Sequence, residues 1–209
     1  MRSTPLLCPL LLLSTVFLSI LGSCATTQHS KFYTLQALSS TLDAKPVNLS
    51  EERISIGVGP VSFPDYLDRP QIVTRVGPNE LSIEEYHRWA GPLEDNFKRI
   101  LAENLSILLD TDRVATFPWQ DSTNVTFQVK VDVLQLDGSL GGQAVLIARW
   151  TIYGKDGKKA LIMQKSKFSA HAAGSSYQQL VLAENQAVND LSRKIASALK
   201  ALSSSIPSS

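Results

Sequence analysis

Cysteine and histidine are scarce in this chain of 209 residues, which contains 2 cysteines and 3 histidines. Cys8 and Cys24 both lie near the N-terminus, whereas His29, His87 and His171 are far apart. No pair of these histidines has the spacing of a helical or hairpin metal site, and a zinc site needs several such ligands. The sequence therefore predicts no metal centre.

The motifs of common enzyme classes are also missing. No Gly-x-Ser-x-Gly turn occurs for a serine nucleophile, and Gly57-x-Gly59 is followed by proline rather than by a helix that could bind a dinucleotide. Acidic pairs such as Glu84-Glu85 are more typical of a solvated surface than of an acid and base pair. We therefore expect no catalytic residues and no enzymatic activity.

An excess of charge of either sign is absent as well. Lys and Arg number 20 and Asp and Glu number 19, so the formal net charge is +1. Binding to nucleic acid usually requires a basic excess, which this composition does not supply. We expect no nucleic-acid partner.

What the chain does have is an apolar run over residues 6–21, which follows Arg2 and ends in Leu21-Gly22-Ser23-Cys24. A short basic start, an apolar stretch and small residues before a cleavage point are typical of a secretory signal peptide. The last four residues resemble a bacterial lipobox, in which the cysteine receives a diacylglyceryl thioether and an N-acyl chain. An ordinary cleaved signal or an uncleaved anchor is the alternative.

The resemblance to a lipobox predicts a signal peptide over residues 1–23 and a lipidated tether over residues 24–30. Cys24 is then the lipidation site, and no disulfide remains because Cys8 is removed with the signal. Its covalent acyl chains are the only non-protein group that we expect, with no separate cofactor. Ala25 after the cysteine favours the outer membrane over the inner one.

Alternation of apolar and polar residues with a period of two predicts half-buried strands downstream of the tether. Segments with this pattern are 31–35, 54–58, 71–76, 80–83, 125–133, 144–153 and 160–170. We expect the strand at 54–58 to be ended by Pro60 and Pro64, and Gly77-Pro78-Asn79 to form a hairpin turn.

Two segments instead have apolar residues at the helical period. The first begins near Pro92 and ends before Asp110, and the second spans about 176–202 with Ser175 or Ser176 as its N-cap. We therefore predict an α+β domain over residues 31–202, with a mixed, largely antiparallel sheet packed by two long helices. We expect residues 203–209 to form a flexible tail. We also expect Trp119 and Trp150 to belong to the core.

A segment rich in proline and aromatic residues links the second strand to the first helix. It includes Val58-Gly59-Pro60-Val61, then Pro64-Asp65-Tyr66-Leu67-Asp68-Arg69-Pro70-Gln71-Ile72-Val73-Thr74-Arg75, and later Arg88-Trp89-Ala90-Gly91-Pro92-Leu93. Proline restricts φ and aromatic rings pack, so this loop should be stiff. Asp68 can stabilise the turn by bonding the nearby backbone or by pairing with Arg69 or Arg75.

These stretches, with Phe32-Tyr33-Thr34-Leu35 and Pro118-Trp119, resemble the PqiC family of ABC-type transport auxiliary lipoproteins. The resemblance implies a fold similar to the N-terminal domain of the TolB type. It also implies a non-catalytic role in lipid transport or membrane integrity, at the periplasmic face of the outer membrane. The implied partner is an MCE-domain protein, PqiB-like, or an ABC importer of that class. Self-association into a ring or dimer is compatible with the family.

Under this resemblance, the docking or loop-locking candidates are Tyr66, Leu67, Asp68, Arg69 and Trp89. Tyr66 and Trp89 equally suit the core, and Asp68 and Arg69 suit a role within the loop. Two other functions stay open. One is a lipid carrier that encloses an acyl chain, which requires an apolar cavity. The other is a structural envelope lipoprotein that contacts peptidoglycan or an outer-membrane assembly machine.

Overall fold

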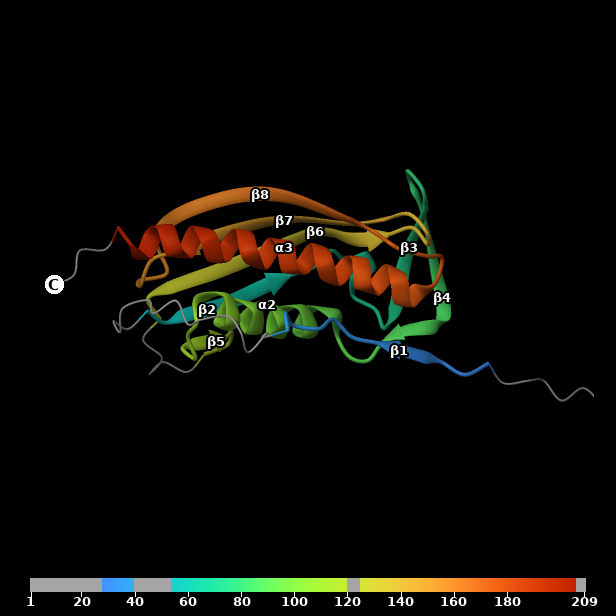
Figure 1. Ribbon diagram of the computed structural model, residues 1–209, viewed down its shortest axis with the longest axis horizontal. Helices are drawn as coiled ribbons and strands as arrows, with labels where there is room; N and C mark the ends of the chain where they lie inside the picture. The colour runs from blue at the N-terminus through green and yellow to red at the C-terminus, as the bar shows by residue number, and fades with distance from the viewer. Residues whose placement is uncertain (1–27, 40–53, 120–124, 206–209) are drawn as a thin grey trace, which may run out of the picture.

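The computed structural model describes residues 28–39, 54–119 and 125–205. The predicted signal peptide and Cys24 lie outside the described residues. The described part contains an 8-stranded sheet and two long helices on one of its faces (Figure 1). The elements in chain order are β1 (Lys31–Tyr33), β2 (Ile56–Ser62), the 3₁₀ turn η1 (Asp65–Leu67), β3 (Gln71–Gly77), β4 (Glu80–Trp89), α2 (Leu93–Leu109), β5 (Val114–Thr116), β6 (Phe127–Gly138), β7 (Gln143–Tyr153), β8 (Ala160–His171) and α3 (Tyr177–Ser203).

The sheet is organised around β6, which pairs antiparallel with β7, and β7 pairs antiparallel with β8. The other edge of β6 pairs in parallel with β2 and, at Gly138, with β3. β3 and β4 form the predicted hairpin, β1 pairs in parallel with β4, and β5 pairs in parallel with β2. β8 therefore forms an edge of the described sheet.

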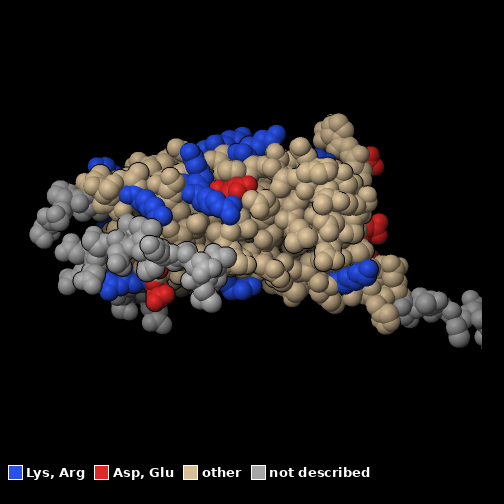
Figure 2. All heavy atoms as spheres, viewed as in Figure 1, with Lys and Arg blue, Asp and Glu red and all other residues tan. Residues whose placement is uncertain are grey.

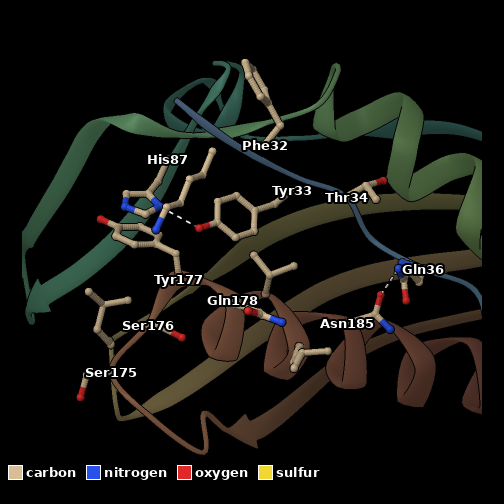
Figure 3. A pocket seen from close by; sticks show the side chains of 14 residues that line it. Phe32, Tyr33, Thr34, Gln36, His87, Ser175, Ser176, Tyr177, Gln178 and Asn185 are labelled. Carbon is tan, nitrogen blue, oxygen red and sulfur yellow. Dashed lines mark hydrogen bonds between the residues drawn. The ribbon is translucent and has the colours of Figure 1, made fainter. Parts of the chain in front are cut away.

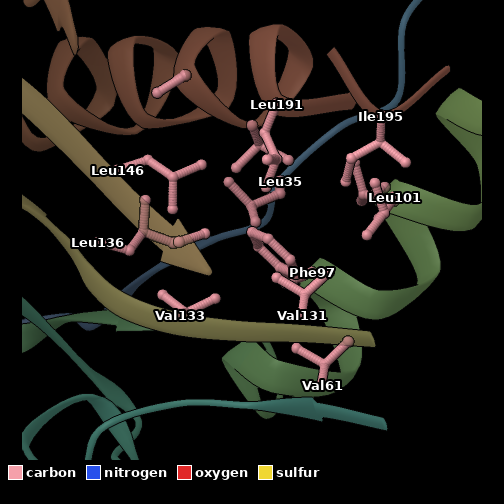
Figure 4. Close-up of a cluster of buried hydrophobic side chains, with 14 of the residues drawn as sticks. Leu35, Val61, Phe97, Leu101, Val131, Val133, Leu136, Leu146, Leu191 and Ile195 are labelled. Atoms are coloured by element: carbon pink, nitrogen blue, oxygen red, sulfur yellow. The ribbon is translucent and has the colours of Figure 1, made fainter. Parts of the chain in front are cut away.

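The core lies between the sheet and the two helices. Along β6 the inward residues Phe127, Val129, Val131 and Val133 are all buried, as the period of two predicts. Side chains from α2, α3, β6 and β7 meet them, together with Leu35 from the segment after β1 (Figure 4). The predicted α+β class is confirmed.

The helix ends match the sequence signals. Pro92 precedes α2, and Asp110 ends it in the left-handed conformation with φ 51°. Ser176 caps α3 by accepting a hydrogen bond from the backbone N–H of Gln179 at 3.3 Å. Pro92 and Asp110 therefore mark the two ends of α2, and Ser176 marks the start of α3.

The end of β2 and the place of Trp119 differ in part from the sequence predictions. β2 passes Pro60 and ends at Ser62, before Pro64, because a bulge between Val58 and Val61 removes Pro60 from the regular pairing with β6. Trp119 is half-buried rather than part of the core. It lies on the outer face of the sheet, where a Cβ on Gly57 would be 2.9 Å from its ring. Trp150 is fully buried, as predicted.

Candidate functional site

The five residues singled out in the loop and at the end of β4 have different environments. Leu67 and Trp89 are core residues, 4% and 6% exposed, and Tyr66 and Arg69 are half-buried. Asp68 is exposed and is thus the one of the five whose side chain is freely available to a partner. Most side chains of this group therefore pack within the domain, and only Asp68 offers an exposed side chain to a partner.

Asp137 of β6 holds this loop against the sheet. Its Oδ1 accepts hydrogen bonds from Arg75 Nε at 2.9 Å and Gln135 Nε2 at 2.8 Å. Its Oδ2 accepts from Arg75 Nη2 at 2.8 Å and from the Tyr66 hydroxyl at 2.9 Å. Arg75 therefore pairs with Asp137, which excludes one of the partners considered for Asp68 from the sequence.

The ionisation of this cluster follows from its contacts. Burial alone would raise the pKa of Asp137, but hydrogen bonds from Arg75, Gln135 and Tyr66 lower it below its usual value. Burial first, and then the Asp137 carboxylate, raise the pKa of the Tyr66 hydroxyl, so that it remains a donor. A buried carboxylate with four donors is a structural anchor, which leaves Tyr66 with a locking contact to β6.

Three asparagines place the chain segment that follows β1. The backbone N–H groups of Leu35, Gln36 and Leu38 donate to the side-chain oxygens of Asn96, Asn185 and Asn104, each at 2.7 Å. Asn96 and Asn104 belong to α2 and Asn185 to α3, so the segment lies across both helices. Side-chain amides thus replace a strand partner, and β1 is held in a defined position beside the start of α3.

A groove of about 890 Å³ runs between β1 and the first turns of α3 (Figure 3). On one side, the Tyr33 hydroxyl lies 2.8 Å from His87 Nδ1, and the His87 ring stacks on Tyr177 with centroids 3.9 Å apart. Burial, followed by the charge of Lys31, lowers the pKa of His87, which favours the neutral ring. This aromatic row forms one wall of the groove.

The rim of the groove exposes apolar side chains. Phe32 is 65% exposed, Leu182 is 53% exposed and Leu140 is 39% exposed. An open groove with exposed apolar residues and a few polar groups is suited to a protein segment rather than to chemistry on a small substrate. Within residues 28–39, 54–119 and 125–205, no group of three or more His, Cys, Asp or Glu side chains could hold a metal ion.

Sequence reasoning missed most of these residues. Asp137 was not among the residues singled out from the sequence, and its partners Arg75 and Tyr66 lie 62 and 71 positions away. His87 lies on β4 and Tyr177 is the first residue of α3, 90 positions later, and neither residue belongs to a recognisable motif. An acid directly before a glycine at the end of an alternating strand was a weak signal for Asp137.

The filled core, the open groove and the fixed loop define the structure as an α+β domain with one long open groove. The sequence over residues 33–196 matches the family described as ABC-type transport auxiliary lipoprotein component, and the chain belongs to this family. It is thus related to accessory lipoproteins of transport systems. A comparison with curated proteins finds no match.

Solved structures share the fold. One, described as an uncharacterized protein, has a TM-score of 0.65 at 19% identity and covers 82% of this chain and 99% of its own. A protein from Xanthomonas campestris, assigned to the family DUF330, has a TM-score of 0.64 at 16% identity and covers 80% of this chain and 93% of its own. At these identities the likeness establishes the fold alone. No helix among the described residues is long and apolar enough to cross a membrane.

Proposed function

We propose that this chain is a lipid-anchored, non-catalytic subunit of an MCE-type intermembrane lipid transport or membrane-integrity system. In this role it sits at the periplasmic face of the outer membrane and docks the MCE-domain protein there. The observation that carries the proposal is the family match over residues 33–196, since members of this family are auxiliary lipoproteins of ABC-type transport. An ABC importer of the same class is the related partner.

The groove beside β1 is the surface best suited to docking. It combines the exposed apolar side chains of Phe32, Leu140 and Leu182 with a wall held rigid by the Tyr33, His87 and Tyr177 contacts. Rigid walls reduce the ordering cost of binding, and exposed apolar residues supply the driving force. Asp68 does not line the groove, so it would be a separate polar contact from the exposed part of the loop. Trp89 is buried and pairs with Tyr33 of β1, so it supports the groove from within, and Leu67 is a core residue.

The anchor supports the same assignment. Cys24 precedes Lys31 of β1 by seven positions in the sequence. Even fully extended, a linker of that length reaches at most ~24 Å. Acyl chains on Cys24 therefore keep β1, and with it the whole domain, at the membrane that holds the anchor, where a protein that bridges the two membranes ends.

A photo-crosslinking residue at position 32 tests this docking surface in cells. Phe32 lines the groove, and exposed Ser197, farther along α3, provides the matched control position. We expect a crosslink to an MCE-domain protein at position 32 and none at position 197. Cys24→Ala in the same strain reports whether the anchor is required. Equal crosslinking at both positions, or recovery of the lipoprotein with no transporter subunit, contradicts the proposal and favours an envelope scaffold.

A lipid carrier would need an enclosed apolar space between sheet and helices. That layer is occupied by tightly packed side chains such as Phe97, Trp150 and Leu191, each fully buried. The groove beside β1 is open to solvent, which suits a protein partner better than a sequestered acyl chain.

A further inference from the structure

The face of the sheet opposite the helices gathers basic side chains across β6, β7 and β8. Arg149 of β7 lies directly opposite Lys165 of β8, and Ile147 lies opposite Lys167. Lys130 of β6 is paired with Thr151, the next outward position of β7. Opposite residues in an antiparallel pair share a face, so these four cations form one surface.

These cations have few partners in the described part of the chain. Arg149, Lys165 and Lys167 are exposed, and none of them forms an ion pair with any described residue. Asp132, the neighbour of Arg149 on β6, lies 3.8 Å from Lys130 and accepts a hydrogen bond from Ser62. Like charges directly opposite each other destabilise a sheet, so the pair of Arg149 and Lys165 suggests an external anion.

Apolar side chains stand beside the cations. Met163 and Leu161 of β8 are 64% and 36% exposed, and Met163 lies opposite Thr151 on the outward face. Phe117 is 42% exposed and packs edge-on against Trp119, which covers Gly57 of β2 on the same outer face. Cations mixed with exposed apolar and aromatic residues are typical of surfaces that lie in a membrane interface.

Figures 1 and 2 view the domain from the helix side. From this side, Lys and Arg side chains are visible along the upper rim where β8 runs, and carboxylates are visible at the end near β4 and at places on the near side. β4 contributes exposed Glu80, Glu84 and Glu85. A chain with almost no net charge thus presents a basic side to its surroundings.

We propose that the basic sheet face, defined by Lys130, Arg149, Met163, Lys165 and Lys167, rests on a membrane surface containing anionic phospholipid. The face is broad, and within the described residues no helix covers it. Lysines on an edge strand also discourage sheets from joining, which accounts for Lys165 and Lys167. That role does not account for Arg149, which lies on β7 between two strands.

An environment-sensitive dye at position 163 tests the contact. The full-length protein, purified from membranes as Met163→Cys and labelled, is reconstituted in vesicles of phosphatidylcholine with or without phosphatidylglycerol. Leu182→Cys, on α3 and 53% exposed, is the matched control, and unmodified protein corrects for labelling at Cys24. The mass of the purified chain reports lipidation separately, so a failed anchor and a failed face contact are distinguishable.

We expect a blue shift at position 163 only with phosphatidylglycerol, and its loss at high salt because the contact is screened. The double variant Lys165→Gln and Lys167→Gln should lower the ratio of molecules with the sheet face on the membrane to molecules with it in solvent. The expected decrease is about 25-fold, because each lysine near an anionic surface contributes about fivefold. Circular dichroism checks that the variant remains folded.

Equal signals at positions 163 and 182 would overturn the proposal, as would a full shift with phosphatidylcholine alone. Polyglutamate, added in place of vesicles, tests whether the basic sheet face binds an acidic polypeptide. A blue shift with polyglutamate but none with anionic vesicles would assign the face to an acidic protein instead of lipid. None of these results depends on which protein docks in the groove beside β1.

Discussion

Glu184→Gln should make the protein more stable, by an amount that grows with pH. Glu184 lies on α3, is 1% exposed, and its Oε2 has no hydrogen-bond partner among the described residues. Burial first, and then the nearby Asp137 carboxylate, raise the pKa of Glu184 well above its usual value of 4.5. The folded protein therefore keeps this proton at pH values where the unfolded chain has lost it.

The sign and size of the effect follow from proton linkage. A raised folded-state pKa means that the stabilising contribution is complete below pH 4.5 and is lost as pH rises toward the folded-state pKa. Over that interval the free energy of unfolding of the wild type falls by about 1.4 kcal/mol per pH unit from this group. Glutamine is neutral throughout and nearly isosteric, so the variant lacks this slope.

Urea unfolding of both proteins over a series of pH values measures the difference. The difference in free energy of unfolding between the variant and the wild type should rise by about 1.4 kcal/mol per pH unit above the usual glutamate pKa. Titrations that are common to both proteins cancel in this difference. Glu103→Gln on α2, at an exposed position, is the matched control for replacing one glutamate by glutamine. A flat difference for Glu184→Gln, or one no steeper than that of the control, would refute the reasoning.

Four further substitutions test contacts of the loop, the helices and β2. Asp137→Asn should lower the free energy of unfolding by about 2–4 kcal/mol at neutral pH in urea, with the deficit shrinking in acid, because the lowered pKa of Asp137 confines its contribution to pH above its folded-state value. Asn104→Ala should cost about 1–3 kcal/mol by the same assay, because Asn104 is fully buried and bonds three groups, and Asn185→Ala, at a half-exposed position, should cost less. Gly59→Ala should lower the melting temperature, measured by circular dichroism, by an amount equivalent to about 2 kcal/mol, because Gly59 has φ +122° and a Cβ there would lie 2.6 Å from Phe117; an unchanged melting temperature would contradict this.

Local patterns were sufficient to predict most elements and their type. The helical period and the signals at Pro92 and Asp110 placed α2 at Leu93–Leu109, and Gly77-Pro78-Asn79 marked the turn between β3 and β4. What local patterns do not contain is pairing. The parallel contact of β1 with β4 joins residues 56 positions apart, and nothing near either strand specifies it.

The same limit explains the site. Tyr66 was recognisable as part of a stiff loop, but its hydrogen-bond partner Asp137 lies 71 residues later. Trp119 was assigned to the core because tryptophan usually is buried, whereas the missing side chain of Gly57 gives the ring a place on the outer face of β2. Both features depend on which strands become neighbours.

The two proposed surfaces lie on opposite sides of the sheet. The groove is lined by α3 and β1, on the side that the helices cover, whereas Arg149 and Lys165 point outward from the bare face. A domain that rests on lipid through the bare face therefore presents the groove away from the membrane, toward a protein that arrives from the periplasm. Loss of the basic face should change how the domain lies on the membrane while leaving the groove intact, so the two proposals can be tested separately.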